Sequence, residues 1–189
     1  MSARPAVFLD RDGTIIEDKG FLADPAGVRV LPTVADALRL LRAHGFAAIV
    51  VSNQSGVARG YFGEDAVRAV NAEIAAQLGS DPSTGSGQAL VEGWYWCPHY
   101  DEGCGCRKPA TGLVERAVAE HGLDVASGRG AVVGDRGSDV ALAHAVGLPG
   151  IVVPGPYPYE GPPPDFRAQT LLDAARWIVL RQAQDDRRG

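Results

Sequence analysis

The sequence of 189 residues is poor in cysteine and has no long apolar run and no cluster of basic residues. Its three cysteines all lie within residues 97–106, and an odd, tightly grouped set argues against a disulfide framework. No apolar segment approaches the roughly 20 residues of a membrane span. The net charge is −5, and the sequence lacks basic patches interleaved with aromatic residues, which are typical of nucleic-acid binding. We therefore expect neither a membrane nor a nucleic acid as a partner.

The N-terminal segment MSARPAVFLD shows no signal-peptide core, because its short apolar stretch runs directly into aspartates. This favours a cytoplasmic protein. The composition, with 46% hydrophobic and 22% charged residues, is ordinary for a globular chain, and the length suits one domain with a full-sized core. Since no internal repeat occurs either, we expect a single domain over residues 1–189.

Short apolar runs alternate with amphipathic segments along the chain. The apolar runs predict strands, and the amphipathic segments, with apolar residues at helical spacing, predict helices. This alternation predicts an α/β fold, a doubly wound and mainly parallel sheet with helices on both faces. The expected strands are 6–9, 46–51, 90–97, 130–135 and 150–154, and the expected helices are 34–44, 63–79, 111–122 and 138–147.

Other segments mark the limits of this pattern. Thr33 is expected to cap the first helix. The small, polar segment 80–88 predicts a mobile loop, and the Pro/Gly-rich stretch 154–164 can hold no regular element. The segment RAQTLLDAARWIVLRQAQ is either one helix or a short edge strand at 177–180 flanked by helix.

Polar residues follow the predicted strands at the points where each strand ends. An Asp-Gly pair such as Asp12–Gly13 on its own indicates only a turn. The carboxyl ends of parallel strands, however, meet in one crevice, where open α/β sheets bind their ligands. Carboxylates suit Mg²⁺, while lysine, arginine and hydroxyl groups suit a phosphoryl group. The groups expected there are Asp10, Asp12, Ser52, Asn53, Gln54, Arg107, Lys108, Asp135 and Asp139.

Four short motifs carry these residues in order: FLDRDGT, VVSNQ, RKP and VGDRGSD, between residues 7 and 139. They resemble the four ordered motifs of the haloacid dehalogenase (HAD) superfamily of phosphatases. The resemblance implies a HAD-like fold and hydrolysis of a phosphomonoester through an aspartyl-phosphate on Asp10. It implies that Asp12 protonates the leaving alcohol and then deprotonates the hydrolytic water. Ser52 and Lys108 would hold the oxygens of the transferring phosphoryl group.

The same resemblance implies a Mg²⁺ ion held by Asp10, the backbone carbonyl of Asp12, and Asp135. Such an ion offsets the repulsion between a carboxylate nucleophile and an anionic substrate. The role of Asp139 stays open at this point. It orients Lys108 or the metal shell, or it simply begins the next helix.

The segment CPHYDEGCGC holds three thiols and one imidazole within residues 97–106. This is a complete tetrahedral set for Zn²⁺, formed by Cys97, His99, Cys104 and Cys106. A full set leaves no open position, so we expect a structural zinc that fixes the loop before Arg107 and Lys108. The alternative is a loop of small residues without a metal.

This zinc-bearing loop resembles the HAD branch that contains D-glycero-D-manno-heptose-1,7-bisphosphate 7-phosphatase and histidinol-phosphate phosphatase. Enzymes of that branch lack a large cap domain, and the present chain has no insertion long enough to form one, which favours a monomer. The chain departs from the branch in one respect, because its gap between His99 and Cys104 is shorter than in many heptose phosphatases.

The stretches DKGFL and SNQSGVARGYF resemble the heptose-bisphosphate enzymes, whose substrate is a small sugar phosphate. From its charge we expect Arg59 to contact the second phosphate. The alternative substrate, histidinol phosphate, carries an amine that requires an acid, and four residues could supply one: Glu17, Asp18, Asp101 and Glu102. The resemblance implies a substrate site lined by Asp18, Lys19, Gly20, Phe21, Ser52, Asn53, Gln54, Ser55, Arg107, Lys108 and Arg136.

Two hypotheses from other functional classes remain. A catalytically silent binding module would usually lack one of the catalytic residues, and all are present: Asp10, Asp12, Lys108 and Asp135. A zinc-dependent interaction protein could instead dock a partner through 97–106. Removal of Mg²⁺ separates these cases, because it should stop only an enzyme.

Overall fold

A seven-stranded sheet forms the framework of the protein. The computed structural model describes residues 3–79, 88–100 and 103–185. Every strand pair is parallel, and the order is β3-β2-β1-β5-β6-β7, with the short β4 beside β1. The predicted parallel α/β fold is confirmed. The strands are β1 (Arg4–Leu9), β2 (Ala47–Asn53), β3 (Gly93–Cys97), β4 (Leu123–Asp124), β5 (Gly130–Gly134), β6 (Gly150–Val152) and β7 (Phe166–Arg167).

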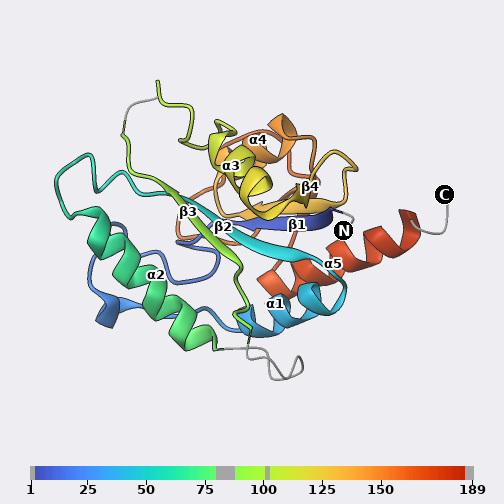
Figure 1. Ribbon diagram of the computed structural model, residues 1–189, viewed down its shortest axis with the longest axis horizontal. Coiled ribbons are helices and arrows are strands. Elements are labelled where there is room, and N and C mark those ends of the chain that lie inside the picture. The colour runs from blue at the N-terminus through green and yellow to red at the C-terminus, as the bar shows by residue number, and fades with distance from the viewer. Residues whose placement is uncertain (1–2, 80–87, 101–102, 186–189) are drawn as a thin grey trace.

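Helices cover both faces of the sheet (Figure 1). The layer of α1, α2 and α5 packs on one face, and α3 and α4 pack on the other. A doubly wound sheet is therefore closed to water on both faces, as its continuous apolar strands require. The helices are α1 (Val34–Ala43), α2 (Glu64–Leu78), α3 (Gly112–His121), α4 (Gly137–Ala145), α5 (Leu171–Asp185) and the 3₁₀ turn η1 (Pro25–Gly27).

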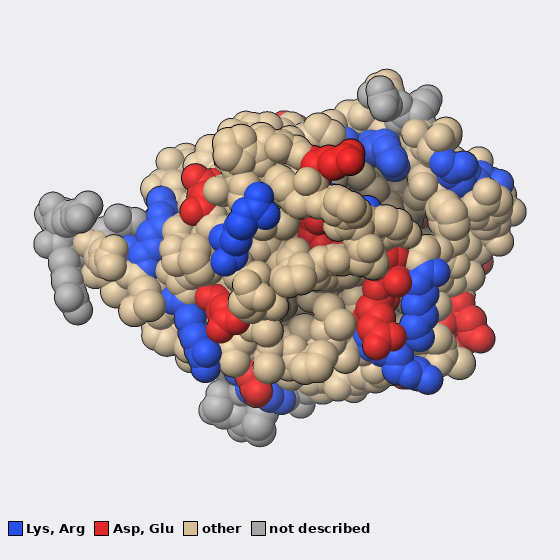
Figure 2. Space-filling model, turned by 180° about the vertical axis from the view of Figure 1, so that it is seen from behind, with Lys and Arg blue, Asp and Glu red and all other residues tan. Residues whose placement is uncertain are grey.

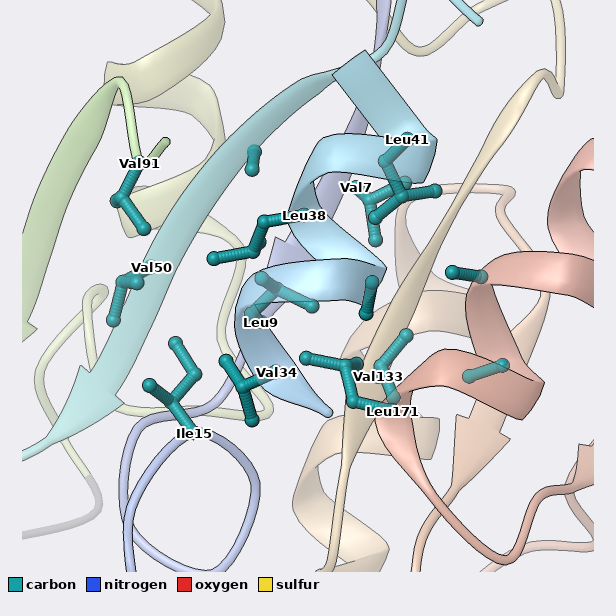
Figure 3. Packing of buried hydrophobic residues seen from close by; sticks show 14 of the residues in the cluster. Val7, Leu9, Ile15, Val34, Leu38, Leu41, Val50, Val91, Val133 and Leu171 are labelled. Atoms are coloured by element: carbon teal, nitrogen blue, oxygen red, sulfur yellow. The ribbon is translucent and has the colours of Figure 1, made fainter. Parts of the chain in front are cut away.

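Alternate residues of β1 enter two separate cores. Val7 and Leu9 pack in the cluster beneath α1 and α5, whereas Ala6 and Phe8 pack in the cluster beneath α3 and α4. All four side chains are 0% exposed, because successive side chains of a strand point to opposite faces. Figure 3 shows Leu38 of α1 pointing toward the strands of the first cluster. The last four residues of β1, which lead to Asp10, are thus buried on both faces of the sheet.

The ends of several elements differ from the prediction. Thr33 does precede α1, but its φ of 67° is left-handed and its side chain makes no capping hydrogen bond. The expected strand at 90–97 begins only at Gly93, while Leu90 and Val91 are buried outside it. Their apolar character reflects packing against the core and not membership of the strand.

The C-terminal segment is a helix, so the alternative of an edge strand at 177–180 is wrong. Ala174 and Ile178, at helical spacing, are buried against the core beside α1, and Trp177 stacks on Phe166 with ring centroids 5.2 Å apart. The edge strand lies earlier, at Phe166–Arg167. The Pro/Gly-rich stretch 154–164 contains no helix or strand, as predicted.

The loop predicted at 80–88 lies outside the described residues, apart from Gln88. On the face shown in Figure 2, basic and acidic side chains are interspersed among uncharged surface. Across the described ranges, no helix is long and apolar enough to cross a membrane.

Candidate active site

The site lies at the topological switch point of the sheet, between β1 and β5, where the order of the strands reverses. From the centre, the chain runs through β1, β2 and β3 toward one edge and through β5, β6 and β7 toward the other. The carboxyl ends of the neighbouring strands β1 and β5 therefore flank the switch point, where α/β sheets form a crevice. Asp10 follows β1 and Asp135 follows β5. The topology alone brings these two carboxylates together.

A pocket of about 340 Å³ opens at this point. Most of the residues that the sequence predicts for the site line this pocket. Two further lining residues, Ser138 and Tyr157, were not predicted. The predicted residues that line it are Asp10, Asp12, Asp18, Gly20, Phe21, Ser52, Asn53, Gln54, Ser55, Arg107, Lys108 and Arg136.

Lys108 forms a buried ion-pair network at the floor of this pocket. Its Nζ lies 2.7 Å from Asp10 Oδ1 and 2.7 Å from Asp139 Oδ1. Burial alone would lower the pKa of Lys108, but the Asp10 and Asp139 carboxylates raise it above its ordinary value. The lysine is therefore held as a cation beside Asp10. Asp139, whose place was open from the sequence, holds this ammonium group.

Asp139 also fixes the start of α4. Its Oδ2 accepts a hydrogen bond from the backbone N–H of Arg136 at 3.0 Å, so the carboxylate serves the helix terminus and the lysine at once. Gly134 leaves room for it, because a Cβ there would lie 2.1 Å from Asp139 Oδ2. The Asp139 side chain therefore connects the start of α4, just after β5, to Lys108 in the pocket.

Asp12 is held from two sides. Gln54 donates from Nε2 to Asp12 Oδ2 at 2.9 Å, and Arg11 donates from Nε to the same oxygen at 3.0 Å and from Nη2 to Oδ1 at 3.2 Å. Burial, reinforced by the Asp10 charge and opposed by Arg11, raises the pKa of Asp12. A raised pKa suits a group that must carry a proton in one step and accept it in the next.

Asp135 fits a cation site. Both of its carboxylate oxygens are buried and make no hydrogen bond to any described residue, although Arg136 Nε lies 3.2 Å from Oδ2. Burial first and then the Asp10 charge raise the pKa of Asp135 to about 7. Carboxylate oxygens of Asp10, Asp135 and Asp139 lie within 4.8 Å of one another. Clustered carboxylate oxygens, with those of Asp135 left without a hydrogen bond from the described part of the chain, could hold a hard cation such as Mg²⁺.

The cysteine segment forms a second possible metal site. Cys97 Sγ lies 3.5 Å from Cys104 Sγ and 3.1 Å from Cys106 Sγ, and His99 Nδ1 lies 3.2 Å from Cys106 Sγ. A tetrahedral zinc with bonds of about 2.3 Å has sulfur–sulfur edges of about 3.8 Å. The sulfur–sulfur distances are shorter than this edge, so the four side chains would have to move slightly apart around the ion, but they offer the right donor chemistry and lie close enough to share one metal. Arg107 connects this loop to the pocket, since its Nη1 donates to the His99 carbonyl at 3.2 Å.

One wall of the pocket combines charge and an aromatic ring. Arg136 Nη2 lies 2.8 Å from Asp18 Oδ2, and its guanidinium lies 4.0 Å from the centroid of the Tyr157 ring. Tyr157 belongs to the irregular stretch 154–164, in which no periodic pattern exists that could have identified it. Ser138 is in the first turn of α4.

Two predicted substrate contacts, Lys19 and Arg59, are not among the lining residues of this pocket. Lys19 Nζ donates to the Gly27 carbonyl at 2.9 Å. The Arg59 guanidinium lies 3.7 Å from the centroid of the ring of Tyr100, which belongs to the cysteine segment. Both charges are therefore engaged at the rim, outside the pocket itself.

A HAD-hydrolase-like family model matches residues 105–156. The D-glycero-beta-D-manno-heptose-1,7-bisphosphate 7-phosphatase of Rhodopseudomonas palustris is 35% identical over 93% of this chain and 95% of its own length. The D-glycero-D-manno-heptose-1,7-bisphosphate 7-phosphatase of Thermosynechococcus vestitus is 33% identical, over 95% and 98% respectively.

A solved structure agrees with these relatives. The D,D-heptose 1,7-bisphosphate phosphatase of B. bronchiseptica, crystallised with magnesium and phosphate, superimposes with a TM-score of 0.75 at 26% identity and covers 94% of this chain and 99% of its own. Near-complete coverage in both directions means that the whole architecture is shared and not only the catalytic motifs. The chain is a HAD-type phosphatase and belongs to the D-glycero-D-manno-heptose-1,7-bisphosphate 7-phosphatase family.

Proposed function

We propose that this phosphatase removes the 7-phosphate of D-glycero-D-manno-heptose 1,7-bisphosphate through an aspartyl-phosphate on Asp10. The observation that carries the mechanism is the placement of two carboxylates and one buried cation in a single pocket. Lys108 occupies only Oδ1 of Asp10, which leaves Oδ2 for attack. The substrate rests on the names of relatives that match almost the whole chain.

Mg²⁺ would be held by Asp10, Asp135 and the backbone carbonyl of Asp12. The unsatisfied oxygens of Asp135 support this assignment, as does the magnesium that the B. bronchiseptica enzyme binds. When bound, the ion polarises the phosphoryl oxygens and reduces the repulsion between substrate and nucleophile.

The protein's own residues account for the remaining steps. Asp10 forms a bond to phosphorus while the ester bond to the sugar oxygen breaks, and Asp12 donates its proton to that oxygen. Lys108 and Ser52 hold the other phosphoryl oxygens as their charge develops. Asp12, now a carboxylate, then takes a proton from the water that attacks phosphorus, and the bond between phosphorus and the Asp10 oxygen breaks. Inorganic phosphate leaves, and both aspartates return to their starting states.

The walls of the pocket favour a bisphosphate over histidinol phosphate. Arg107 supplies positive charge beyond Lys108, which a second phosphate requires. The amine of histidinol phosphate requires a free acid, but Asp18, the predicted acid that lines the pocket, is paired with Arg136. Glu17 lies outside the lining, 3.7 Å from Lys19. The other two acids of that hypothesis, Asp101 and Glu102, fall outside the described residues.

We assign a structural Zn²⁺ to Cys97, His99, Cys104 and Cys106. Four protein ligands leave no position for water, so the ion would hold the loop without taking part in hydrolysis. Its effect on the reaction would be indirect, through Arg107 and Lys108. The cytoplasmic location and the monomeric state stay predictions.

Phosphate release tests the proposal. Heptose 1,7-bisphosphate and histidinol phosphate are each incubated with the protein, with and without Mg²⁺, and with Asp10→Asn as the blank. We expect Mg²⁺-dependent release from the heptose, with a preference over histidinol phosphate, and no release by the variant. Release only from histidinol phosphate would keep the mechanism and replace the substrate. Activity that persists in Asp10→Asn would overturn the aspartyl-phosphate.

A further inference from the structure

Arg11 stands between the two catalytic aspartates and is itself buried. Only 1% of its surface is exposed, and an arginine is rarely so enclosed unless it is paired. Buried ion pairs can often be replaced by apolar residues without loss of stability. Stability alone therefore gives no reason for a guanidinium at this position.

The contacts of Arg11 orient the Asp12 carboxyl group. Nε and Nη2 bond to both oxygens of Asp12, at 3.0 and 3.2 Å, as a planar fork that fixes the plane of the carboxylate. Gln54 bonds to Oδ2 from another direction. The Asp12 side chain keeps 16% of its surface exposed, and it lines the pocket. The group is thus fixed at its back and open toward the substrate.

A third contact fixes Arg11. Its Nη1 donates to Asn71 Oδ1 at 3.1 Å. Asn71 lies on the buried side of α2 with Val70 and Ile74 and is only 8% exposed. A polar residue on the apolar side of a helix needs a partner, and here that partner is Arg11. The helix thereby connects rigidly to the catalytic loop.

We propose that Arg11, anchored by Asn71, is a positioning residue that aims the Asp12 carboxyl at the oxygen of the leaving group. This inference rests on the proposed function, because it takes Asp12 as the acid. An acid that is aimed correctly matters most when the leaving group is a strong base. A weakly basic leaving group departs without a proton.

The test compares two aryl phosphates that differ in the basicity of the leaving group, 4-nitrophenyl phosphate and phenyl phosphate. For each variant, kcat/KM is measured on both esters, since it reports the step in which the ester bond breaks. In Arg11→Met we expect the ratio of kcat/KM on phenyl phosphate to that on 4-nitrophenyl phosphate to fall about 30-fold, which is less than the roughly 100-fold or more that general acid catalysis contributes, because Asp12 itself is still present. The same ratio should fall by a similar factor in Arg11→Lys, because lysine keeps the positive charge but lacks the planar pair of N–H donors that contacts both oxygens of Asp12.

Asn71→Leu gives a milder variant that leaves Arg11 in place. We expect the same ratio to fall about fivefold, since a small misplacement of a catalytic group already costs rate. Gln77→Leu is the matched control on the same helix, where the side chain bonds to Val28 and Glu73 instead. It should leave the ratio unchanged. Thermal unfolding of every variant shows whether it is folded.

The outcomes separate the inference from the proposed function. If Arg11→Met and Asn71→Leu are folded and lower kcat/KM equally on both esters, Arg11 is structural and the inference is wrong. Restoration of the wild-type ratio in Arg11→Lys would also overturn it, because charge alone would then suffice. If the wild-type protein hydrolyses neither the aryl phosphates nor the heptose bisphosphate, the proposed function fails and the inference with it.

Discussion

The space around Asp135 depends on glycine. A Cβ at Gly155 would lie 2.2 Å from Asp135 Oδ2, and one at Gly13 would lie 2.6 Å from the same atom. Gly13 also has a φ of +81°, which L side chains rarely adopt. The carboxylate that we assign to Mg²⁺ is therefore enclosed by two residues that have no side chain, and any methyl group there must displace it.

Gly155→Ala should weaken Mg²⁺ binding and slow turnover. We expect phosphate release at fixed, subsaturating Mg²⁺ to fall about 100-fold, because misplacing a catalytic group by about 1 Å costs that much. A Mg²⁺ titration of the rate measures the effect. Gly63→Ala is the control, since a Cβ there meets nothing closer than 4.0 Å. Equal Mg²⁺ dependence in Gly155→Ala and the wild type would contradict the assignment of Asp135.

Tyr157→Ala should raise KM for the bisphosphate and change kcat little. The ring lies over Arg136, and an exposed cation–π contact is worth about 1 kcal/mol, which corresponds to about a fivefold increase in KM. Steady-state kinetics on heptose 1,7-bisphosphate measure it. Tyr157→Phe keeps the ring and should behave as the wild type. A fall in kcat with KM unchanged would place Tyr157 in the chemical step instead.

The sequence identified the site residues that carry reactive groups but missed those that support them. Asp10 and Asp12 stand out because charge after a buried strand is unusual, and Lys108 stands out through the RKP motif. The motif itself indicated no role for Arg11, which lies between its two aspartates, because the burial of an arginine depends on tertiary packing. One signal was present: Asn71 interrupts the apolar side of its predicted helix. Tyr157 had none, because the irregular stretch 154–164 obeys no periodicity.

Among the elements, the loop of Cys97–Cys106 leads the chain directly to the pocket residues Arg107 and Lys108. It follows β3, which lies at the edge of the sheet away from Asp135, and it returns the chain to the pocket at Arg107 and Lys108. Among the described residues of this loop, 97–100 and 103–106, only Cys97 belongs to a helix or strand. Cross-linking by the proposed zinc would supply the order that hydrogen-bonded elements supply elsewhere.

Cys104→Ser should lower the zinc content and the activity together. We expect kcat/KM to fall about tenfold or more, because ligand loss frees the segment that presents Lys108 and a shift of about 1 Å is already costly. Metal analysis and phosphate release on the same preparation measure both. Gly105→Ala is the control within the loop, since a Cβ there meets no atom within 4 Å. Full activity in zinc-free Cys104→Ser would contradict a structural role for the metal.

Elements were predicted well where burial and periodicity agree, and less well at their ends. The short run of apolar residues in β1 fits a strand covered on both faces, and the structure confirms it. Val91 shows the limit, because an apolar side chain packs into the core equally well from a loop. The segment at 177–180 reads as either strand or helix over four residues, and only its packing beside α1 decides between them.

For the whole molecule, the two cores share one sheet. Neighbouring residues of β1 belong to different cores, so neither helical layer can detach without exposing apolar surface of the central strand. The resulting cost, about 25 cal/mol for each Å² of apolar surface exposed, couples the two layers. This arrangement favours the single domain that we infer from the length of the chain.

Unfolding should therefore be one cooperative transition, and the three tryptophans can report it from opposite edges of the sheet. Trp94 and Trp96 lie on β3, and Trp177 packs on Phe166 of β7. In urea, fluorescence of Trp177→Phe follows the β3 edge, and fluorescence of the double variant Trp94→Phe/Trp96→Phe follows the β7 edge. Each fluorescence midpoint should coincide with the far-UV circular dichroism midpoint of the same variant, as two-state unfolding requires. Separate midpoints within either variant would mean that its edge unfolds independently and that the chain is not one cooperative domain.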